Sequence, residues 1–372
     1  TNPTAMDTYD VAVIPGDGIG VEVVDAALPV VDAAAADAGF SISTTRFDWG
    51  TERHLDRGAM MPDDGLDRLR EFDAIFLGAV GHPEVPDHVT LHGLLLPIRK
   101  GLDQYVCKRP NVLFEGIDGP LRGYGAGDID FVVYRENTEG EYASVGGREH
   151  RGFDHETAIQ SAVFTRRGTE RIVRAAFEAA VEREGHLTSI TKSNAQAHSM
   201  VFWDDIVAEV SEEFPSVAVE RLLVDAAAMD LIRRPEAFDV VVASNLFGDV
   251  LTDIGAQITG SVGLAPSGNV HPGDDAPSMF EPVHGSAPDI EGDGVANPLA
   301  TVLSWSMLFD DLGEAAAADA LWSAVTDQLA DGSAPRTPDI GGGAGTHPGA
   351  GGLPTRPEAP PPRPPPPPPP PP

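Results

Sequence analysis

Two aspartates at helical spacing are the residues of this chain best placed for metal chemistry. Asp249 and Asp253 follow the apolar run 238–243, which predicts a buried strand, and Gly248 predicts a sharp turn after it. If a helix starts there, both carboxylates lie on one face in its first turns, about 5–6 Å apart at Cβ. Two such hard oxygen ligands suit Mg²⁺ or Mn²⁺. The alternative is an N-cap aspartate followed by a solvated one.

Three arginines have the chemistry to bind a dicarboxylate. Arg99 and Arg109 lie in one arginine-bearing stretch, and Arg135 ends the predicted strand 130–135. A planar guanidinium group pairs with a carboxylate through two hydrogen bonds, so three arginines around one site would hold two carboxylates. The alternative is that each is a surface arginine paired with one of the many acids.

One lysine is a candidate base. The chain has only three lysines, Lys100, Lys108 and Lys192, and Lys192 lies near the end of the predicted strand 188–194. A buried lysine near other cations has a lowered pKa and can accept a proton from a substrate. The alternative is a strand-end lysine that buries its stem and keeps its ammonium group in water.

Alternating strands and helices must position these residues. The sequence predicts strands over residues 10–14, 41–47, 73–81, 130–135, 188–194, 217–223 and 238–243. It predicts helices over residues 21–39, 62–72, 169–183, 202–213, 300–312 and 315–330. This alternation is typical of an α/β sheet.

Two glycine-containing segments predict loops. Residues 15–20 have the spacing G-x-G-x-G rather than G-x-G-x-x-G, so they predict a tight strand–helix turn rather than a dinucleotide fingerprint. Residues 278–290 predict a long polar binding loop. The Gly- and Pro-rich residues 344–372 predict a disordered or polyproline II tail. A tag, a cloning scar or a reading-frame error would explain that tail equally well.

Composition limits the compartment and the partners. A chain of 372 residues with 41% hydrophobic residues predicts two domains or one large α/β unit. The single cysteine, Cys107, fits a reducing cytoplasm, and we expect neither a signal peptide nor a membrane span. The net charge of −33 disfavours nucleic acid and anionic membranes as partners. Because concentrated salt screens such self-repulsion, our hypothesis is a salt-adapted, halophilic cytoplasmic protein.

Four motifs, taken together, resemble the isocitrate/isopropylmalate dehydrogenase family. They are residues 13–20, 135–140, 245–249 and 281–289, and the similarity runs in the family's order over about residues 9–343. Within the family the chain is similar to the tartrate and D-malate (decarboxylating) dehydrogenases, through residues 76–81, 102–105, 139–147 and 164–168.

The resemblance implies an α/β, isopropylmalate-dehydrogenase-like two-domain fold with a large mixed sheet flanked by helices, not a true Rossmann domain. Residues 1–104 and 260–343 would form a large cofactor-side domain, and residues 105–259 a smaller inserted domain with the substrate and metal residues and the dimer contacts. A homodimer would share each active site between its subunits.

The resemblance also implies roles for individual residues. Asp249 and Asp253, with Asp225 of the partner subunit, would bind the metal. Lys192 of the partner subunit would help to remove the hydroxyl proton, and Tyr142 would protonate the carbon left by CO₂. Arg99, Arg109 and Arg135 would hold the substrate carboxylates, and His92, Leu95 and Leu96 would lie around its variable group. The implied cofactor residues are Asn194, near the nicotinamide, and Glu281, His284, Gly285, Ser286, Asp289, Ile290 and Asn297.

These roles imply NAD-dependent, divalent-metal-dependent oxidative decarboxylation of a 2-hydroxy dicarboxylate of the D-malate or tartrate type. Asp289 on the adenosine ribose would repel a 2′-phosphate, and Ile290 agrees with NAD rather than NADP. His92 departs from the pattern, because tartrate and D-malate enzymes tend to have Trp there and isopropylmalate enzymes Glu. The alternatives are a 3-isopropylmalate dehydrogenase and, more remotely, a non-catalytic regulatory relative.

Overall fold

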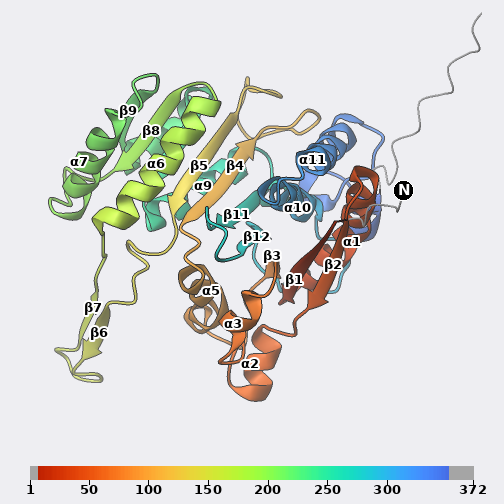
Figure 1. Cartoon of the computed structure of the whole chain (residues 1–372), viewed down its shortest axis with the longest axis horizontal. Coiled ribbons are helices and arrows are strands. Elements are labelled where there is room, and N and C mark those ends of the chain that lie inside the picture. The colour runs from red at the N-terminus through yellow and green to blue at the C-terminus, as the bar shows by residue number, and fades with distance from the viewer. Residues whose placement is uncertain (1–6, 352–372) are drawn as a thin grey trace, which may run out of the picture.

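A mixed sheet of ten strands runs through the whole molecule (Figure 1). The computed structural model describes residues 7–351. In spatial order the strands are β2 (Ser41–Arg46), β1 (Thr8–Gly16), β3 (Ala74–Ala79), β12 (Ser278–Pro282), β11 (Pro266–Val270), β4 (Val106–Val112), β5 (Asp130–Glu136), β10 (Val240–Ala243), β8 (His186–Thr191) and β9 (Ala218–Leu223). Strand β11 runs antiparallel to β12 and β4, and β4 runs antiparallel to β5, whereas all other neighbours are parallel.

Helices flank this sheet, and a small hairpin projects from it. The longer helices are α1 (Ile19–Ala38), α6 (Arg166–Glu182), α7 (Ser199–Ser211), α8 (Val224–Arg233), α9 (Asn245–Ile258), α10 (Leu299–Asp311) and α11 (Ala315–Ala330). The shorter turns are α2 (Thr51–Arg57), α3 (Gly65–Leu69), α4 (Asp87–Thr90), η1 (Leu91–Leu95), α5 (Leu96–Gly101), η2 (Pro235–Ala237), η3 (Val262–Leu264), η4 (Pro338–Ile340) and α12 (Thr346–Gly351). Strands β6 (Gly146–Glu149) and β7 (Thr157–Gln160) form the projecting hairpin (Figure 1). No described helix is both long enough and apolar enough to cross a bilayer.

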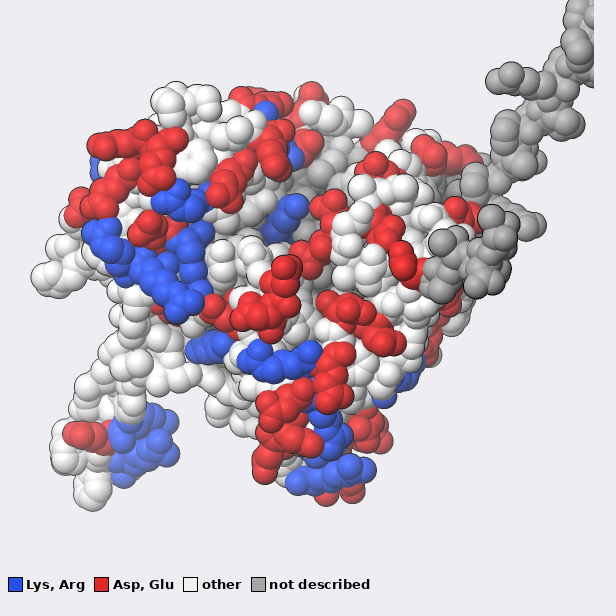
Figure 2. Space-filling view, in the orientation of Figure 1, with Lys and Arg blue, Asp and Glu red and all other residues white. Residues whose placement is uncertain are grey.

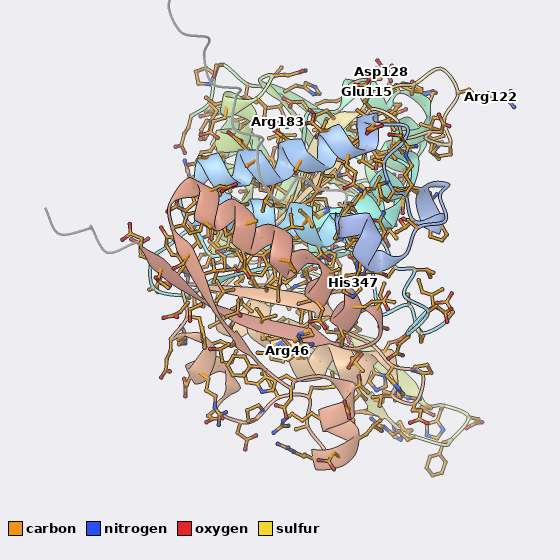
Figure 3. All side chains as sticks on the ribbon, turned by 90° about the vertical axis from the view of Figure 1, so that its right-hand side faces the viewer. Arg46, Glu115, Arg122, Asp128, Arg183 and His347 are labelled. Carbon is orange, nitrogen blue, oxygen red and sulfur yellow. The ribbon has the colours of Figure 1, made fainter. Side chains whose placement is uncertain are left out.

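Alternate residues of each strand point to opposite faces of the sheet and pack against different helices. In β3, Phe76 stacks on Trp305 of α10, whereas Ile75 belongs to the separate apolar cluster that contains Ile98 of α5. In β5, Val132 belongs to the cluster of α6 and α7, whereas Val133 belongs to that of α9. Helix α1 lies beside α10 and α11, so both ends of the described chain build one layer (Figure 3). The predicted α/β fold with a large mixed sheet is therefore confirmed.

The strand order follows the predicted division of the chain, but the sheet is continuous. Strands β2, β1, β3, β12 and β11 come from residues 1–104 and 260–343, and the other five come from residues 105–259. One apolar cluster contains both Phe280 of β12 and Phe131 of β5. The two-domain division therefore remains a prediction.

The helix that carries the two aspartates begins earlier than predicted. Ser244 is the N-cap and α9 starts at Asn245, so Gly248 lies inside the helix and the predicted turn at Gly248 is wrong. A Cβ atom at Gly248 would lie 2.7 Å from Cβ and Cγ of Arg135, so the glycine permits close packing instead. Asp249 and Asp253 still share one helix, but they lie beyond its first turn.

Other segments also differ from the sequence prediction, and strands β4 and β11 and helix α8 were not predicted. Only Gly65–Leu69 is helical within residues 62–72. The first five residues of the predicted loop 278–290 form the buried strand β12, because β3 and β11 hydrogen-bond to either side of it. Residues Thr346–Gly351 of the predicted tail form helix α12, and Gly349 O accepts a 2.8 Å hydrogen bond from Gln328 Nε2. The proline tract lies outside the described residues.

Acidic side chains are spread over the face of the molecule that Figure 2 shows. With a net charge of −33, these carboxylates repel one another across water. The Debye length falls from about 10 Å at ~0.1 M salt to about 3 Å at ~1 M, so concentrated salt removes most of this repulsion.

We expect the thermal midpoint of unfolding to rise steeply between dilute buffer and molar KCl, because screening stabilises the folded acidic surface. Differential scanning calorimetry over a KCl series measures this. Sucrose at matched osmolality is the control, since it is excluded from the protein surface but does not screen charge. Equal midpoints in dilute and concentrated KCl would contradict the salt-adaptation hypothesis.

Candidate active site

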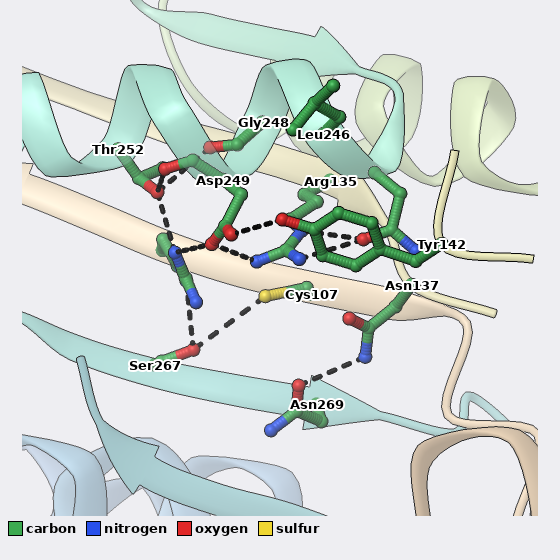
Figure 4. Close-up of polar contacts among 12 residues, drawn as sticks. Cys107, Arg135, Asn137, Tyr142, Leu246, Gly248, Asp249, Thr252, Ser267 and Asn269 are labelled. Atoms are coloured by element: carbon green, nitrogen blue, oxygen red, sulfur yellow. Dashed lines mark hydrogen bonds and ion pairs between the residues drawn. The ribbon is translucent and has the colours of Figure 1, made fainter. Parts of the chain in front are cut away.

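The Asp249 carboxylate is the centre of a polar cluster beside helix α9 (Figure 4). Its Oδ1 lies 2.6 Å from Arg135 Nη1 and 3.2 Å from Arg109 Nη1, and its Oδ2 accepts a 2.7 Å hydrogen bond from the Tyr142 hydroxyl. Burial acts to raise the pKa of Asp249, but Arg135 and Arg109 outweigh it and hold this pKa at about 2. The structure thus brings together four residues for which the sequence predicted site roles.

Helix α9 also fixes the two arginines. Arg135 is only 1% exposed and donates from Nε and Nη2 to Asn245 Oδ1, at 3.1 and 2.7 Å. Arg109 is also buried and donates from Nη1 to Thr252 Oγ1 at 2.7 Å. Asn245 and Thr252 both belong to α9, so one helix aligns both guanidinium groups. The alternative interpretation as surface arginines is wrong for these residues.

Arg99, at the end of α5, is the third buried arginine. Its Nη2 donates a 2.6 Å hydrogen bond to Glu281 Oε1, which also accepts 2.9 Å from Asn269 Nδ2. Within the described chain, Arg99 Nε is buried and has no hydrogen-bond partner. A buried donor in that state costs about 1–3 kcal/mol, so an anionic ligand that accepts from it would be stabilised there.

A cavity of about 540 Å³ opens beside this cluster. One wall is a single face of the segment 88–99, in which α4 passes through the π-helical turn η1 into α5. This face presents His88, Leu91, His92, Leu95, Leu96 and Arg99. The other lining residues are Arg109, Arg135, Glu141, Tyr142, Gln160 and Asp249. The residues predicted to lie around the substrate's variable group, His92, Leu95 and Leu96, therefore share one cavity with the three arginines.

The predicted metal residues fall into two places on the chain. Asp253 follows Asp249 by one helical turn, and its pKa is raised by burial and by the Asp249 charge. Asp225 instead pairs with Lys192, whose Nζ lies 2.7 Å from Asp225 Oδ1. Among residues 7–351 no three His, Cys, Asp or Glu side chains gather as a metal-binding group. One copy of the chain therefore does not assemble the predicted three-aspartate site.

Most of the predicted cofactor residues lie in or beside the loop that follows β12. The backbone N–H of Ile19 donates 2.9 Å to Ser286 O, which ties this loop to the start of α1. A Cβ atom at Gly18 would lie 2.1 Å from the same oxygen, so only glycine fits there. This contact confirms a tight strand–helix turn at residues 15–20 and places the loop beside it.

Within that region the polar side chains differ in burial. His284 is buried, burial lowers its pKa, and its Nε2 has no partner within the described residues. Asn297 is also buried and donates 3.0 Å to Asp339 Oδ2. Gly285 and Asp289 are exposed and Ile290 is half-buried. Asn194 is exposed next to Lys192 rather than on this loop.

Sequence reasoning missed several residues that shape the site. Glu141 accepts a 2.7 Å hydrogen bond from Ser244 Oγ and so fixes the start of α9. His88 and Gln160 line the cavity. The four-residue spacing between His88 and His92 could have revealed His88. Glu141 and Gln160 carried no local signal, because only tertiary contacts bring them there.

The protein has a mixed β-sheet flanked by helices, and three buried arginines lie beside a carboxylate and a cavity. These features are typical of an enzyme that binds a small anionic substrate. The chain belongs to the isocitrate/isopropylmalate dehydrogenase family, whose sequence profile matches residues 10–349. It is therefore an oxidoreductase of the dehydrogenase class, and the family prediction is confirmed.

Individual relatives agree with this assignment. Over 343 residues the chain is 50% identical to a probable tartrate dehydrogenase/decarboxylase of Agrobacterium vitis, covering 92% of this chain and 95% of that protein. Over 349 residues it is 49% identical to D-malate dehydrogenase (decarboxylating) of Escherichia coli K12, covering 92% and 96%. The crystal structure of isocitrate dehydrogenase from Methylococcus capsulatus matches with a TM-score of 0.84 at 33% identity, covering 93% and 98%.

Proposed function

We propose that the protein catalyses NAD-dependent, divalent-metal-dependent oxidative decarboxylation of a 2-hydroxy dicarboxylate of the D-malate or tartrate type. The observation that carries this proposal is the convergence of Arg99, Arg109 and Arg135 on one cavity with Tyr142 and Asp249. The names of the relatives at 49–50% identity support the substrate class. The single, buried cysteine supports a cytoplasmic location.

Three buried arginines offer hydrogen-bond donors to a dianion at the cavity. Asp249 and Glu281 are paired with these arginines and Glu141 also lines the cavity, so these charges balance and a bound divalent cation would supply the positive charge that a dianion needs. The unpartnered Nε of Arg99 adds a free donor in a planar guanidinium group. A carboxylate accepts such donors in pairs, and a second carboxylate would lie against the other arginines.

The donor set fits a hard divalent cation. Asp249 and Asp253 present oxygen ligands from one face of α9, and the partner's Asp225 would complete three carboxylates. Burial and the neighbouring Asp249 charge raise the pKa of Asp253. A bound cation would offset both effects, because it stabilises the charged carboxylate. When bound, Mg²⁺ or Mn²⁺ supplies positive charge to the reacting oxygens and NAD⁺ supplies the hydride acceptor.

The loop after β12 would hold NAD. The residues for this role are Glu281, His284, Gly285, Ser286, Asp289, Ile290 and Asn297, with Asn194 of the partner subunit near the nicotinamide. Asp289 is exposed on this loop, and its negative charge there would repel the 2′-phosphate of NADP.

Two side chains would move the protons. Lys192 of the partner subunit would take the proton from the hydroxyl oxygen while the carbon that bears this hydroxyl gives its hydride to NAD⁺. After CO₂ departs, the Tyr142 O–H bond would break as a C–H bond forms, and water would return a proton to the phenolate. The pKa of Tyr142 is raised to about 12 by burial and by its hydrogen bond to Asp249, so the phenol holds its proton at neutral pH.

We also propose a homodimer, because exposed apolar side chains lie at helical spacing from the metal aspartates on α8 and α9. Asp225, Met229 and Ile232 follow one another at helical spacing on α8, where Met229 is 62% and Ile232 55% exposed. On α9 the exposed Leu246 and Val250 are spaced in the same way before Asp253. A second copy that covered these rows would bring its own Asp225 and Lys192 towards the first copy's α9. Light scattering in molar KCl would give the mass, and a monomer would contradict this proposal.

A single assay separates the candidate substrates. NADH formation is followed by absorbance in molar KCl with Mn²⁺, using D-malate, tartrate and 3-isopropylmalate in parallel. We expect the highest kcat/KM with D-malate or tartrate, and formation of CO₂ in step with NADH. The second candidate, 3-isopropylmalate dehydrogenase, is favoured by the apolar wall of Leu91, Leu95 and Leu96, and preference for that substrate would select it. If none of the three substrates gives NADH, the remaining hypothesis is a non-catalytic relative.

A further inference from the structure

Lys100 joins helix α5, which forms part of the cavity wall, to the segment that carries Tyr142. It follows Arg99 in the last turn of α5, and its Nζ donates a 2.8 Å hydrogen bond to the backbone oxygen of Tyr142. The two neighbouring side chains therefore differ in their targets: Arg99, which lines the cavity, reaches Glu281, whereas Lys100 reaches the Tyr142 main chain.

Among residues 7–351, Lys100 makes the one hydrogen bond that joins the Tyr142 segment to the other part of the sheet. Within the described chain, the remaining hydrogen bonds of residues 140–143 come from residues 105–259. They join Gly140 to Val163, the Glu141 carboxylate to Ser244 and Leu246, the Tyr142 hydroxyl to Asp249, and Ala143 O to Gln160. Lys100 alone reaches this segment from residues 1–104 or 260–343. A shift of α5 against α9 would therefore pull on the Tyr142 main chain through this hydrogen bond.

The local charges keep Lys100 in that position. Burial lowers its pKa, and the nearby Glu136 carboxylate opposes that shift. Glu136 is itself buried and fixed by hydrogen bonds of 2.9 Å from Thr138 N, Thr138 Oγ1 and Glu139 N. The half-buried ammonium group thus has a fixed carboxylate nearby and a carbonyl acceptor in direct contact.

We infer that Lys100 is a positioning residue, which holds Tyr142 in place for the proton transfer that follows CO₂ loss and makes that step depend on the placement of α5. This inference rests on the proposed function, in which Tyr142 protonates the product carbon. Without Lys100, the phenol would keep its chemistry but lose its fixed position relative to the substrate that Arg99 binds. Hydride transfer precedes this step and does not use Tyr142.

The test compares the first turnover with steady-state turnover in the full-length protein. With the best of the three substrates, Lys100→Met should still form NADH rapidly up to about one equivalent per site, followed by steady-state turnover at least about 10-fold below wild type. General acid–base groups contribute about 10²–10⁴-fold, and a displaced donor should lose part of that. The deuterium isotope effect of substrate labelled at the carbinol carbon should fall below the wild-type value, because the later proton transfer to carbon would then limit the rate.

Further variants separate positioning from a general structural role. Lys100→Arg keeps a charged donor and should recover much of the steady-state rate. Tyr142→Phe with Lys100→Met should be no slower than Tyr142→Phe alone, because Lys100 acts through Tyr142. Lys108→Met is the matched control, since this lysine on β4 lines a separate cavity with Tyr134, and it should behave as wild type. If Lys100→Met does not fold, Lys100→Gln, which keeps a neutral donor, is measured by the same criteria.

The opposite results overturn the inference. Equal losses in the first turnover and in the steady state, or multiplied losses in the double variant, would mean that Lys100 does not act through Tyr142. The proposed function fails in a different way, because wild-type protein would then form no NADH from any of the three substrates.

Discussion

Replacing Asp249 with Asn should both lower the stability of the protein and abolish turnover. Asparagine keeps the shape and one acceptor, but it leaves the buried Arg135 and Arg109 without their counter-charge. Removing one partner of a buried ion pair costs about 3–5 kcal/mol, and the 35% exposure of the Asp249 side chain favours the lower end. Turnover should fall at least about 100-fold, since even outer-shell partners of a metal contribute about 10–100-fold.

Asp253→Asn is the matched control for the loss of stability. Asp253 lies one turn later on the same helix, and its pKa is raised by burial and by Asp249, so its charged form is disfavoured in the fold. We expect Asp253→Asn to lower turnover, as a lost metal ligand should, but to leave the thermal midpoint unchanged or higher. Melting is measured in KCl with EDTA, so that metal binding does not contribute. Equal midpoints for the two variants would contradict the ion-pair argument.

The acid dependence of stability follows from the direction of the Asp249 shift. Its pKa is about 2 in the folded chain, below the ordinary value of 3.8. A lowered pKa stabilises the fold at every pH above the ordinary value, and that contribution declines only as the pH falls from there through about 2. The difference in midpoint between wild type and Asp249→Asn should therefore be constant at neutral pH and shrink on strong acidification.

Several regular elements could be predicted closely because their signals are local, whereas strands β4 and β11 and helix α8 were not predicted. Helix α11 was predicted over residues 315–330 and occupies those residues. Helix α10 was predicted over residues 300–312, and it begins and ends one residue earlier. Strand β12 was missed because its five residues, SMFEP, combine polar side chains with a proline. Its structure is decided by pairing with β3 and β11, which no local pattern contains.

The candidate site was predictable where spacing or residue type carried the chemistry. The spacing of Asp249 and Asp253 survived even though the predicted start of their helix did not. Gly248 was interpreted as a turn, because a glycine needed for close packing against Arg135 has the same sequence signal as a turn glycine. The resemblance assigned Lys192 and Asp225 to one subunit's share of the site, but their direct pairing has no local signal, since the end of β8 and the start of α8 are brought together only by the tertiary fold.

Replacing Lys192 with Met should lower turnover by about 10²–10⁴-fold, the usual contribution of a general base, and leave the fold intact. Its Nζ contacts Asp225, whose side chain is 61% exposed, and exposed ion pairs contribute about 0–1 kcal/mol to stability. The measurements are kcat with saturating substrate and the thermal midpoint. Near-normal turnover would remove Lys192 from the mechanism, and a large loss of midpoint would make its role structural.

A mixture of two inactive variants tests whether Lys192 serves its own site or its partner's. If the site combines Asp249 of one subunit with Lys192 of the other, a hybrid dimer of Lys192→Met and Asp249→Asn contains one site with both residues intact and one with neither. Random reassociation makes about half of the dimers hybrid, so activity should recover to about a quarter of wild type. If Lys192 instead serves the site of its own subunit, each hybrid site lacks one residue and no activity returns. Because each variant is inactive alone, recovered activity has no other source than a site built across the dimer.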